Sequence, residues 1–375
     1  MGDATARAKR HYAALGDFSD LVDLAERHGW FGWRRDDAPV GGRARWATAA
    51  RQALGPRSGD LEYPISVRTE RRFRRGGIDG EVVSWDVGFG PRSVAFVLRP
   101  AGEDGPLPGV VALHCHGGFK YYGKEKIADG PDGAPPEVAA VRDQLYGGVA
   151  YANLLAEQGY VVLVPDAFGF GSRRVSIAGV DEHDVAGYNA AAVAHEHVVE
   201  KHCRLLGTSF GALVAREDRI AAAYLQRRSD VAAGGVGCIG LSGGGFRAGA
   251  LHATCPSIVA SVVVAMMSSY GGLVDDHVAR HTWMLYPDAL PVSADWPEVV
   301  GSRTDIPLFV QYAARDELFS REGMDQADRI LGYAFAADRR GGDYTGRFYP
   351  VPHCFDPAMQ ADAFSFLAEA LGRRE

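Results

Sequence analysis

The chain has 375 residues, of which 47% are hydrophobic and 23% charged, a composition that excludes disordered and collagen-like proteins. Its length allows a sizeable core without disulfides and fits one large domain or two. The net charge of −7 gives no overall attraction to nucleic acid or to anionic lipid, so we expect neither as a partner.

Cysteine usage and the first residues bear on cofactors and location. The five cysteines lack a C-x-x-C pair, which argues against a disulfide framework and a zinc site; they are Cys115, Cys203, Cys238, Cys255 and Cys354. Residues 1–17 contain no apolar signal core, and the longest apolar stretches, such as 258–267, are too short to cross a bilayer. We therefore expect a cytoplasmic protein without membrane contact, metal or cofactor.

Residues 1–60 form the first distinct segment. Apolar residues such as Leu21 and Leu24 recur at helical spacing, which predicts a helical N-terminal extension packed on the main domain. The segment also carries three of the six tryptophans, Trp30, Trp33 and Trp46. A tryptophan cluster can bind sugar rings, but we favour core packing. The extension is also our candidate contact for a homodimer.

Residues 61–375 are predicted to form the main domain, which begins with strands. The segments 65–73, 81–87 and 94–98 alternate or run apolar between turns rich in glycine and proline, as antiparallel hairpins do. The basic cluster at 71–75 lies in the first of them. We interpret it as a solvated strand edge rather than a binding patch.

After residue 106 the pattern changes to short apolar runs that alternate with helical segments. The runs lie at 110–114, 160–165, 236–239, 258–265, 307–312 and 347–350, and helices are expected at 141–158, 190–206 and 212–227. This alternation predicts an α/β fold with a mostly parallel sheet covered by helices on both faces. The segments at about 172–232 and 266–305 exceed single crossovers, so we expect cap insertions there.

The motif G-x-S-x-G occurs twice, around Ser209 and Ser242. A nucleophile elbow needs a buried strand before the serine, a helix after it and small neighbours on its strained turn. Ser242 meets these requirements, because the apolar run 236–239 precedes it and Gly243, Gly244 and Gly245 follow it. The residues before Ser209 are polar and helix-like, so we interpret that serine as a helix start.

A serine hydroxyl needs a histidine to take its proton and an acid to orient the histidine. In the elbow topology these partners follow the serine in the order acid, histidine, each after a later strand. Asp316 follows the run 307–312, with Glu317 as a lesser candidate for the acid. His353 follows the last run, and it is our candidate for the base.

The oxyanion that forms during acyl transfer needs preset backbone N–H donors. The amide of Gly243, directly after the nucleophile, is one candidate. The second should come from the glycine-containing loop after 110–114, where we choose Gly118, with Phe119 next. Two groups of histidines are weaker metal candidates: the pair His114 and His116, and the helical set His195, His197 and His202, whose spacing points them to different faces.

At this point the sequence resembles the α/β-hydrolase superfamily, and more narrowly its acetyl xylan esterase-like and dienelactone hydrolase-like branch. The matching segments are HCHGGFKYYGKEK at 114–126, VPDAFGFGSR at 164–173, GLSGGG at 240–245, HTWMLYPDAL at 281–290, ARDELF at 314–319 and YPVPHCFD at 349–356. The resemblance implies an α/β-hydrolase fold and serine-dependent ester hydrolysis. The chain differs from dienelactone hydrolases proper, which are shorter and use a cysteine nucleophile.

The sequence therefore predicts a serine hydrolase that cleaves a small-molecule carboxylic ester through an acyl-enzyme. The same three residues could serve a C–C hydrolase, an amidase or peptidase, or an acyl transferase of specialised metabolism, and a non-catalytic binding module is a further alternative. Five residues are candidates for substrate contact, with loop or core packing as the alternative for each: Phe119, Lys120, Tyr121, Phe168 and Trp283.

Overall fold

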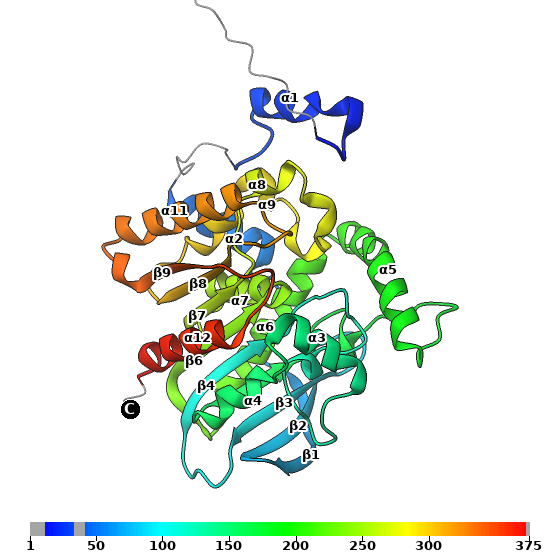
Figure 1. Cartoon of the computed structure of the whole chain (residues 1–375), viewed down its shortest axis with the longest axis vertical. Helices are drawn as coiled ribbons and strands as arrows, with labels where there is room; N and C mark the ends of the chain where they lie inside the picture. The colour runs from blue at the N-terminus through cyan, green and yellow to red at the C-terminus, as the bar shows by residue number, and fades with distance from the viewer. Residues whose placement is uncertain (1–11, 34–41, 373–375) are drawn as a thin grey trace, which may run out of the picture.

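The computed structural model describes residues 12–33 and 42–372. Among these residues, nine strands form one sheet in the order β1-β2-β3-β5-β4-β6-β7-β8-β9 (Figure 1). The strands are β1 (Ile65–Arg75), β2 (Ile78–Asp86), β3 (Ser93–Pro100), β4 (Leu107–Leu113), β5 (Val161–Pro165), β6 (Val231–Leu241), β7 (Ile258–Val264), β8 (Leu308–Ala313) and β9 (Tyr344–Tyr349). All the strand segments expected from the sequence are present.

The first three strands pair antiparallel, and β3 continues antiparallel onto β5. Strand β1 lies at the edge of the sheet and is exposed along nearly its whole length. Three of its basic residues pair with acidic neighbours: Arg71 with Asp132, Arg72 with Glu81 and Arg74 with Asp79. The interpretation of this cluster as a solvated edge is confirmed, and the charges disfavour pairing with a further strand.

From β5 to β9 all neighbouring strands are parallel. Strands β5 and β8 are buried at every residue, because helices cover both faces, as the apolar runs predicted. The helices α3 (Pro136–Tyr146), α4 (Tyr151–Glu157) and α12 (Pro357–Ala370) share one core cluster with the sheet, and α2 (Arg43–Leu54), α6 (Phe210–Gln226), α7 (Gly243–Thr254), α10 (Trp296–Val300) and α11 (Arg321–Ala337) share the other. The mostly parallel α/β architecture is confirmed.

One helix expected from the sequence is two helices in the structure. The segment 141–158 was predicted as continuous, but α3 ends at Tyr146 and α4 begins at Tyr151. Gly147 and Gly148 separate them with φ values of 66° and 78°, which end a right-handed helix. The expected helix 212–227 agrees closely with α6, and the expected helix 190–206 corresponds to α5 (Val185–Leu205), which begins five residues earlier.

The two long excursions differ in structure. The segment at about 172–232 contains α5, which projects from the side of the layers in Figure 1, followed by α6 within them. The segment at about 266–305 contains only short helices, which include α8 (Tyr270–Val274), α9 (Leu290–Ser293) and α10. None of the helices in the described ranges is long and apolar enough to span a membrane.

The N-terminal segment contains α1 (Asp20–His28) and α2, while residues 1–11 and 34–41 of the expected extension lie outside the described ranges. Helix α1 has no buried residue and lies apart from the layers in Figure 1. Trp33 and Trp46 are buried in the core, as predicted, but Trp30 is 54% exposed. Core packing was therefore the wrong interpretation for Trp30, which stacks on His28, at the end of α1.

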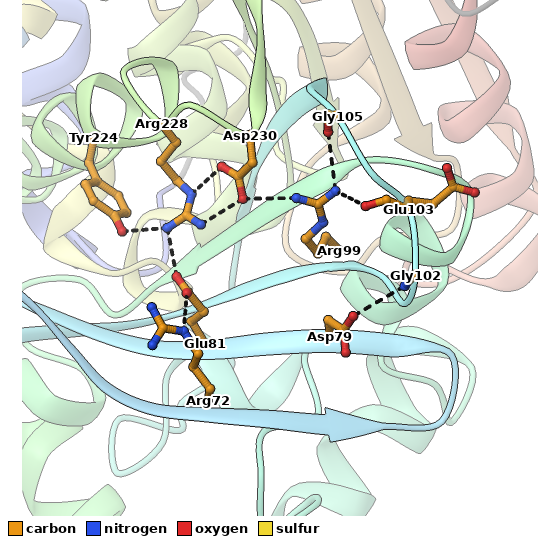
Figure 2. Close-up of polar contacts among 10 residues, drawn as sticks. All are labelled: Arg72, Asp79, Glu81, Arg99, Gly102, Glu103, Gly105, Tyr224, Arg228 and Asp230. Carbon is orange, nitrogen blue, oxygen red and sulfur yellow. Dashed lines mark hydrogen bonds and ion pairs between the residues drawn. The ribbon is translucent and has the colours of Figure 1, made fainter.

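A cluster of charged residues ties the antiparallel strands to the turn between α6 and β6 (Figure 2). At its centre the Arg228 guanidinium binds Asp230 through two hydrogen bonds of 2.8 Å and also donates to Glu81 on β2, at 3.0 Å. Its third partner is the Tyr224 hydroxyl on α6, at 2.8 Å. Arg99 on β3 reaches the other side of Asp230. These contacts hold the pKa of Asp230 below its usual range.

Replacing Arg228 by methionine should lower the free energy of unfolding by about 2 kcal/mol. Removing the guanidinium leaves two half-buried carboxylates with weaker partners, a cost between those of exposed and fully buried ion pairs. Arg72→Met is the matched control, because Arg72 pairs with the same Glu81 but has a side chain that is 76% exposed. We expect that variant to lose less than about 0.5 kcal/mol. Urea denaturation measures both, and equal losses would contradict the central role of Arg228.

Candidate active site

Ser242 lies on the sharp turn between β6 and α7. Its backbone has φ 59° and ψ −121°, a combination that L-residues rarely adopt and that exposes the side chain at the end of the strand. Its N–H donates to the carbonyl of Val264, at 2.9 Å. The glycines around it are required by space, since a Cβ on Gly244 would lie 2.1 Å from the carbonyl oxygen of Leu113. The turn therefore has the backbone geometry of a nucleophile elbow.

The second G-x-S-x-G motif has a different structure. Ser209 is the N-cap of α6, and its hydroxyl accepts the N–H of Ala212 at 3.2 Å. The side chain satisfies a free donor at the helix start, which is the usual task of a serine in that position. Of the two serines, only Ser242 lies on a strained strand-to-helix turn.

Asp316 and His353 form a hydrogen-bonded pair beyond the carboxyl ends of β8 and β9. The Nδ1–H of His353 donates to Oδ2 of Asp316 at 2.6 Å, and Oδ1 of Asp316 accepts the N–H of Leu318 at 2.8 Å. The aspartate side chain is 1% exposed and the imidazole 16%. Glu317, the lesser candidate for the acid, is exposed. The imidazole is therefore oriented by a buried carboxylate and keeps its Nε2 available.

The segment that carries His353 returns across the sheet. After β9, at the edge, it runs over the ends of the middle strands before α12 begins (Figure 1). The N–H of Phe355 donates to the carbonyl of Leu145 at 2.7 Å, and the Gln360 amide donates to the carbonyl of Tyr146 at 2.9 Å. These bonds fix the loop to the end of α3. The end of α3 in turn contacts the loop after β4, where the Tyr146 hydroxyl accepts the N–H of Cys115 at 3.2 Å. Among the described residues, no hydrogen bond joins the Ser242 hydroxyl to His353.

The loop after β4 lies directly beside the elbow. A Cβ built on Gly243 would be 2.8 Å from the backbone nitrogen of His116. The N–H of Gly118, our sequence-based candidate donor, instead donates to Nδ1 of the His116 ring at 3.1 Å. The His116 amide has no hydrogen-bond partner within the described ranges. The Gly118 N–H is therefore already used by the His116 ring, while the backbone nitrogen of His116 lies next to Gly243.

The buried side chain of Glu196 connects its own helix, α5, to the loop after β4 and to the segment at 282–283. Glu196 accepts the Nε2–H of His116 at 3.0 Å and pairs with the ammonium of Lys120. Its other oxygen accepts the Thr282 hydroxyl at 2.5 Å and the N–H of Trp283 at 2.7 Å. His116 and Lys120 together hold the pKa of Glu196 well below its usual range, while burial lowers the pKa of His116. The imidazole accepts the Gly118 N–H at Nδ1, donates to Glu196 at Nε2, and so bridges the loop to the helix.

Sequence reasoning missed two residues around the site, Glu196 and His281. His281 donates through Nε2 to the carbonyl of Leu318 at 2.8 Å, and burial lowers its pKa to about 4. It therefore supports, as a neutral ring, the turn whose N–H binds Asp316. Glu196 is one of several polar residues on a helix and lies in no pattern that indicates a site, whereas His281 is the first residue of the matching segment 281–290, which gave no role for it.

The five candidates for substrate contact are placed differently. Lys120 is buried and paired with Glu196, and Phe168 packs between Phe89 and Phe210. The remaining three are at least partly exposed: Phe119 stacks on Tyr122, Tyr121 packs against Tyr122 and Tyr188, and Trp283 is 42% exposed. Of the five, only Lys120 is buried; Phe168, like Phe119 and Tyr121, is partly exposed, although it packs against the core.

Within the described ranges, four of the five histidines considered as metal candidates, all except His195, have other hydrogen-bond partners. His114 is buried and donates to the carbonyl of Cys115, and His197 and His202 donate to carbonyls of their own helix. Across 12–33 and 42–372 there is no group of three or more histidine, cysteine, aspartate or glutamate side chains arranged to hold a metal ion.

Comparison by sequence finds a relative that is named as a hydrolase. No family model matches the chain. A Bacillus subtilis protein named "Putative hydrolase YtaP" is 26% identical over 316 residues, which cover 84% of this chain and 96% of that protein.

Solved structures with similar folds carry esterase names. A "putative acetyl xylan esterase" from Bacteroides fragilis has a TM-score of 0.65 at 15% identity, over 90% of this chain and 83% of that one. Acetyl xylan esterase 1 from Thermoanaerobacterium has a TM-score of 0.57 at 14% identity, over 92% and 98%. A glucuronoyl esterase from Solibacter usitatus has a TM-score of 0.59 at 13% identity, over 88% and 91%. The chain has the α/β-hydrolase fold that its sequence predicted.

Proposed function

We propose that this protein is a serine hydrolase that cleaves a small carboxylic ester, with Ser242 as nucleophile, His353 as base and Asp316 as the orienting acid. The observation that carries the proposal is the strained elbow at Ser242 on the same sheet edge as a buried Asp–His pair. Because Nδ1 of His353 donates to Asp316, its Nε2 is the nitrogen that can accept a proton from a hydroxyl.

The reaction follows the usual acyl-transfer sequence. The Ser242 oxygen bonds to the ester carbon while its proton passes to Nε2 of His353, and the imidazolium is stabilised by Asp316. The C–O bond to the leaving alcohol then breaks as His353 returns the proton to that oxygen. Water, deprotonated by His353, hydrolyses the acyl-enzyme and restores the serine. No step requires a metal or a cofactor.

We assign the oxyanion donors to the amides of Gly243 and His116. Gly243 is the first residue of α7, so its N–H has no partner within the helix and lies at the positive end of the helix dipole. His116 replaces Gly118 in this role, because the Gly118 N–H is already bound to the His116 ring. Preset donors of this kind typically contribute a factor of about 10²–10³ each in rate.

The structural neighbours are named as acetyl xylan and glucuronoyl esterases, which favours an ester over the alternative bonds. C–C hydrolysis, amide hydrolysis and acyl transfer would use the same trio. Phe119, Tyr121 and Trp283 are our candidates for substrate contact at the mouth of the site. The domain division at about residue 60, the cap role of 172–232 and 266–305, the homodimer contact and the cytoplasmic location remain predictions.

A fluorophosphonate probe tests this proposal directly. We expect covalent labelling of the wild-type chain on the peptide that contains Ser242, identified by mass spectrometry, and hydrolysis of p-nitrophenyl acetate that the probe abolishes. A panel of esters, amides and β-diketones then identifies the bond class. Absence of labelling together with absence of turnover on the panel would favour a binding module, and labelling at Ser209 would refute the assignment of the nucleophile.

A further inference from the structure

Lys126 lies at the end of a short 3₁₀ turn, η2 (Lys124–Lys126), with a relative exposure of 0%. Its ammonium donates to three backbone carbonyls, of Cys115 at 2.5 Å, Phe119 at 3.0 Å and His116 at 3.3 Å. All three belong to the loop after β4. An ammonium has three protons and no acceptor, so this one loop uses its full donor capacity.

The direction of the carbonyls matters, because the C=O and N–H of one trans peptide point to opposite sides. The peptide between Cys115 and His116 has its carbonyl held by Lys126 and also by Nδ1–H of His114, at 3.1 Å. Its N–H, that of His116, must therefore face away from Lys126. That nitrogen is the one next to Gly243 at the elbow.

We propose that Lys126 is a positioning residue for the oxyanion hole, which holds the Cys115–His116 peptide so that the His116 N–H stays turned toward the reacting carbonyl. The inference rests on the proposed function, since it assigns a task within that mechanism. Lys126 does not touch the substrate; it acts through the loop. Glu196 fixes the His116 side chain from the opposite side, and the two buried charges leave the loop little freedom.

The surroundings of Lys126 make its charge titratable near neutral pH. Burial lowers the pKa of the ammonium to about 8, against partial support from acidic neighbours and from the Phe170 ring, 4.9 Å from the ammonium. The titratable and charged groups around it are His114, Cys115 and His116 on the loop, Glu125 on η2, Arg142 on α3, Asp166 after β5 and Arg247 on α7. A neutral amine has only two N–H donors, so one carbonyl would then face a lone pair.

The test compares Lys126→Met with Lys124→Met. Lys124 is the matched control, because it is also a buried lysine in the same turn. Its ammonium binds Asp166 at 2.9 Å and Glu125 rather than the loop after β4. We expect Lys126→Met to lower kcat on p-nitrophenyl acetate by about 10²-fold with KM changed less than threefold. Lys124→Met should keep kcat within about threefold, although both variants lose thermal stability.

The pH profile supplies a readout that a structural role would not change. We expect wild-type kcat to fall as pH rises through about 8, and the fall to be absent in Lys126→Met. Equal kcat values in Lys126→Met and Lys124→Met would overturn this inference. A wild-type kcat that stays constant from pH 7.5 to 9.5 would also overturn it, and that measurement does not depend on a variant that folds. A wild-type chain that neither hydrolyses esters nor labels at Ser242 overturns the proposed function itself, and the positioning role with it.

Discussion

Replacing Ser242 by alanine is expected to lower kcat on p-nitrophenyl acetate by about 10⁴–10⁶-fold, because no other described hydroxyl lies on an elbow of this geometry. The residual rate would come from the oxyanion donors and from substrate binding alone. The free energy of unfolding should change by less than about 1 kcal/mol. Alanine has to adopt the same backbone conformation as serine, and the Ser242 side chain caps no helix.

Ser209→Ala is the matched control, since it removes the same atom from the other G-x-S-x-G motif. Its kcat should stay within about twofold of the wild type. Its free energy of unfolding should fall by about 1 kcal/mol, because the N-cap bond to Ala212 is lost. Ser242→Ala should therefore lose activity with little loss of stability, whereas Ser209→Ala should lose stability with little loss of activity. Near-normal turnover by Ser242→Ala, or a large loss of kcat in Ser209→Ala, would refute our choice between the motifs.

The strands could be predicted from the sequence because burial on both faces of a parallel sheet leaves continuous apolar runs. The break between α3 and α4 could not be predicted in the same way. Apolar residues such as Val141, Leu145 and Leu155 continue the helical spacing across it, and only the αL conformations of Gly147 and Gly148 end the first helix. Glycine permits that conformation without requiring it, so the sequence alone leaves both outcomes open.

In the candidate site, too, some features could be predicted from the sequence and others could not. Ser242, Asp316 and His353 could be proposed because each follows an apolar run that identifies a strand end, and the order along the chain is fixed by the topology. The orientation of a peptide plane carries no such pattern. In our proposal, Lys126 and Glu196 decide whether Gly118 or His116 turns its N–H to the elbow; they lie 10 and 80 positions from His116 and reach it through contacts that only folding creates.

Replacing Asp316 by asparagine should lower kcat by roughly 10²–10⁴-fold with little change in KM or in the fold. The Leu318 N–H donates to one oxygen of Asp316, at 2.8 Å, so the asparagine amide should keep its oxygen there and turn its NH₂ toward His353. Nδ1 of His353 would then accept a hydrogen bond and the ring proton would move to Nε2. In that tautomer the imidazole cannot take a proton from Ser242.

Glu317→Gln is the matched control, because it makes the same change of charge on the adjacent, exposed side chain. We expect its kcat to remain within about twofold of the wild type, since the contact of Glu317 seen among the described residues is made by its backbone carbonyl, which accepts from Arg280 at 2.9 Å. Reaction with a fluorophosphonate should slow in parallel with kcat in Asp316→Asn, because both reactions need the same activated serine. If Glu317→Gln were the slower enzyme, the acid would have to be reassigned, and with it the orientation of His353.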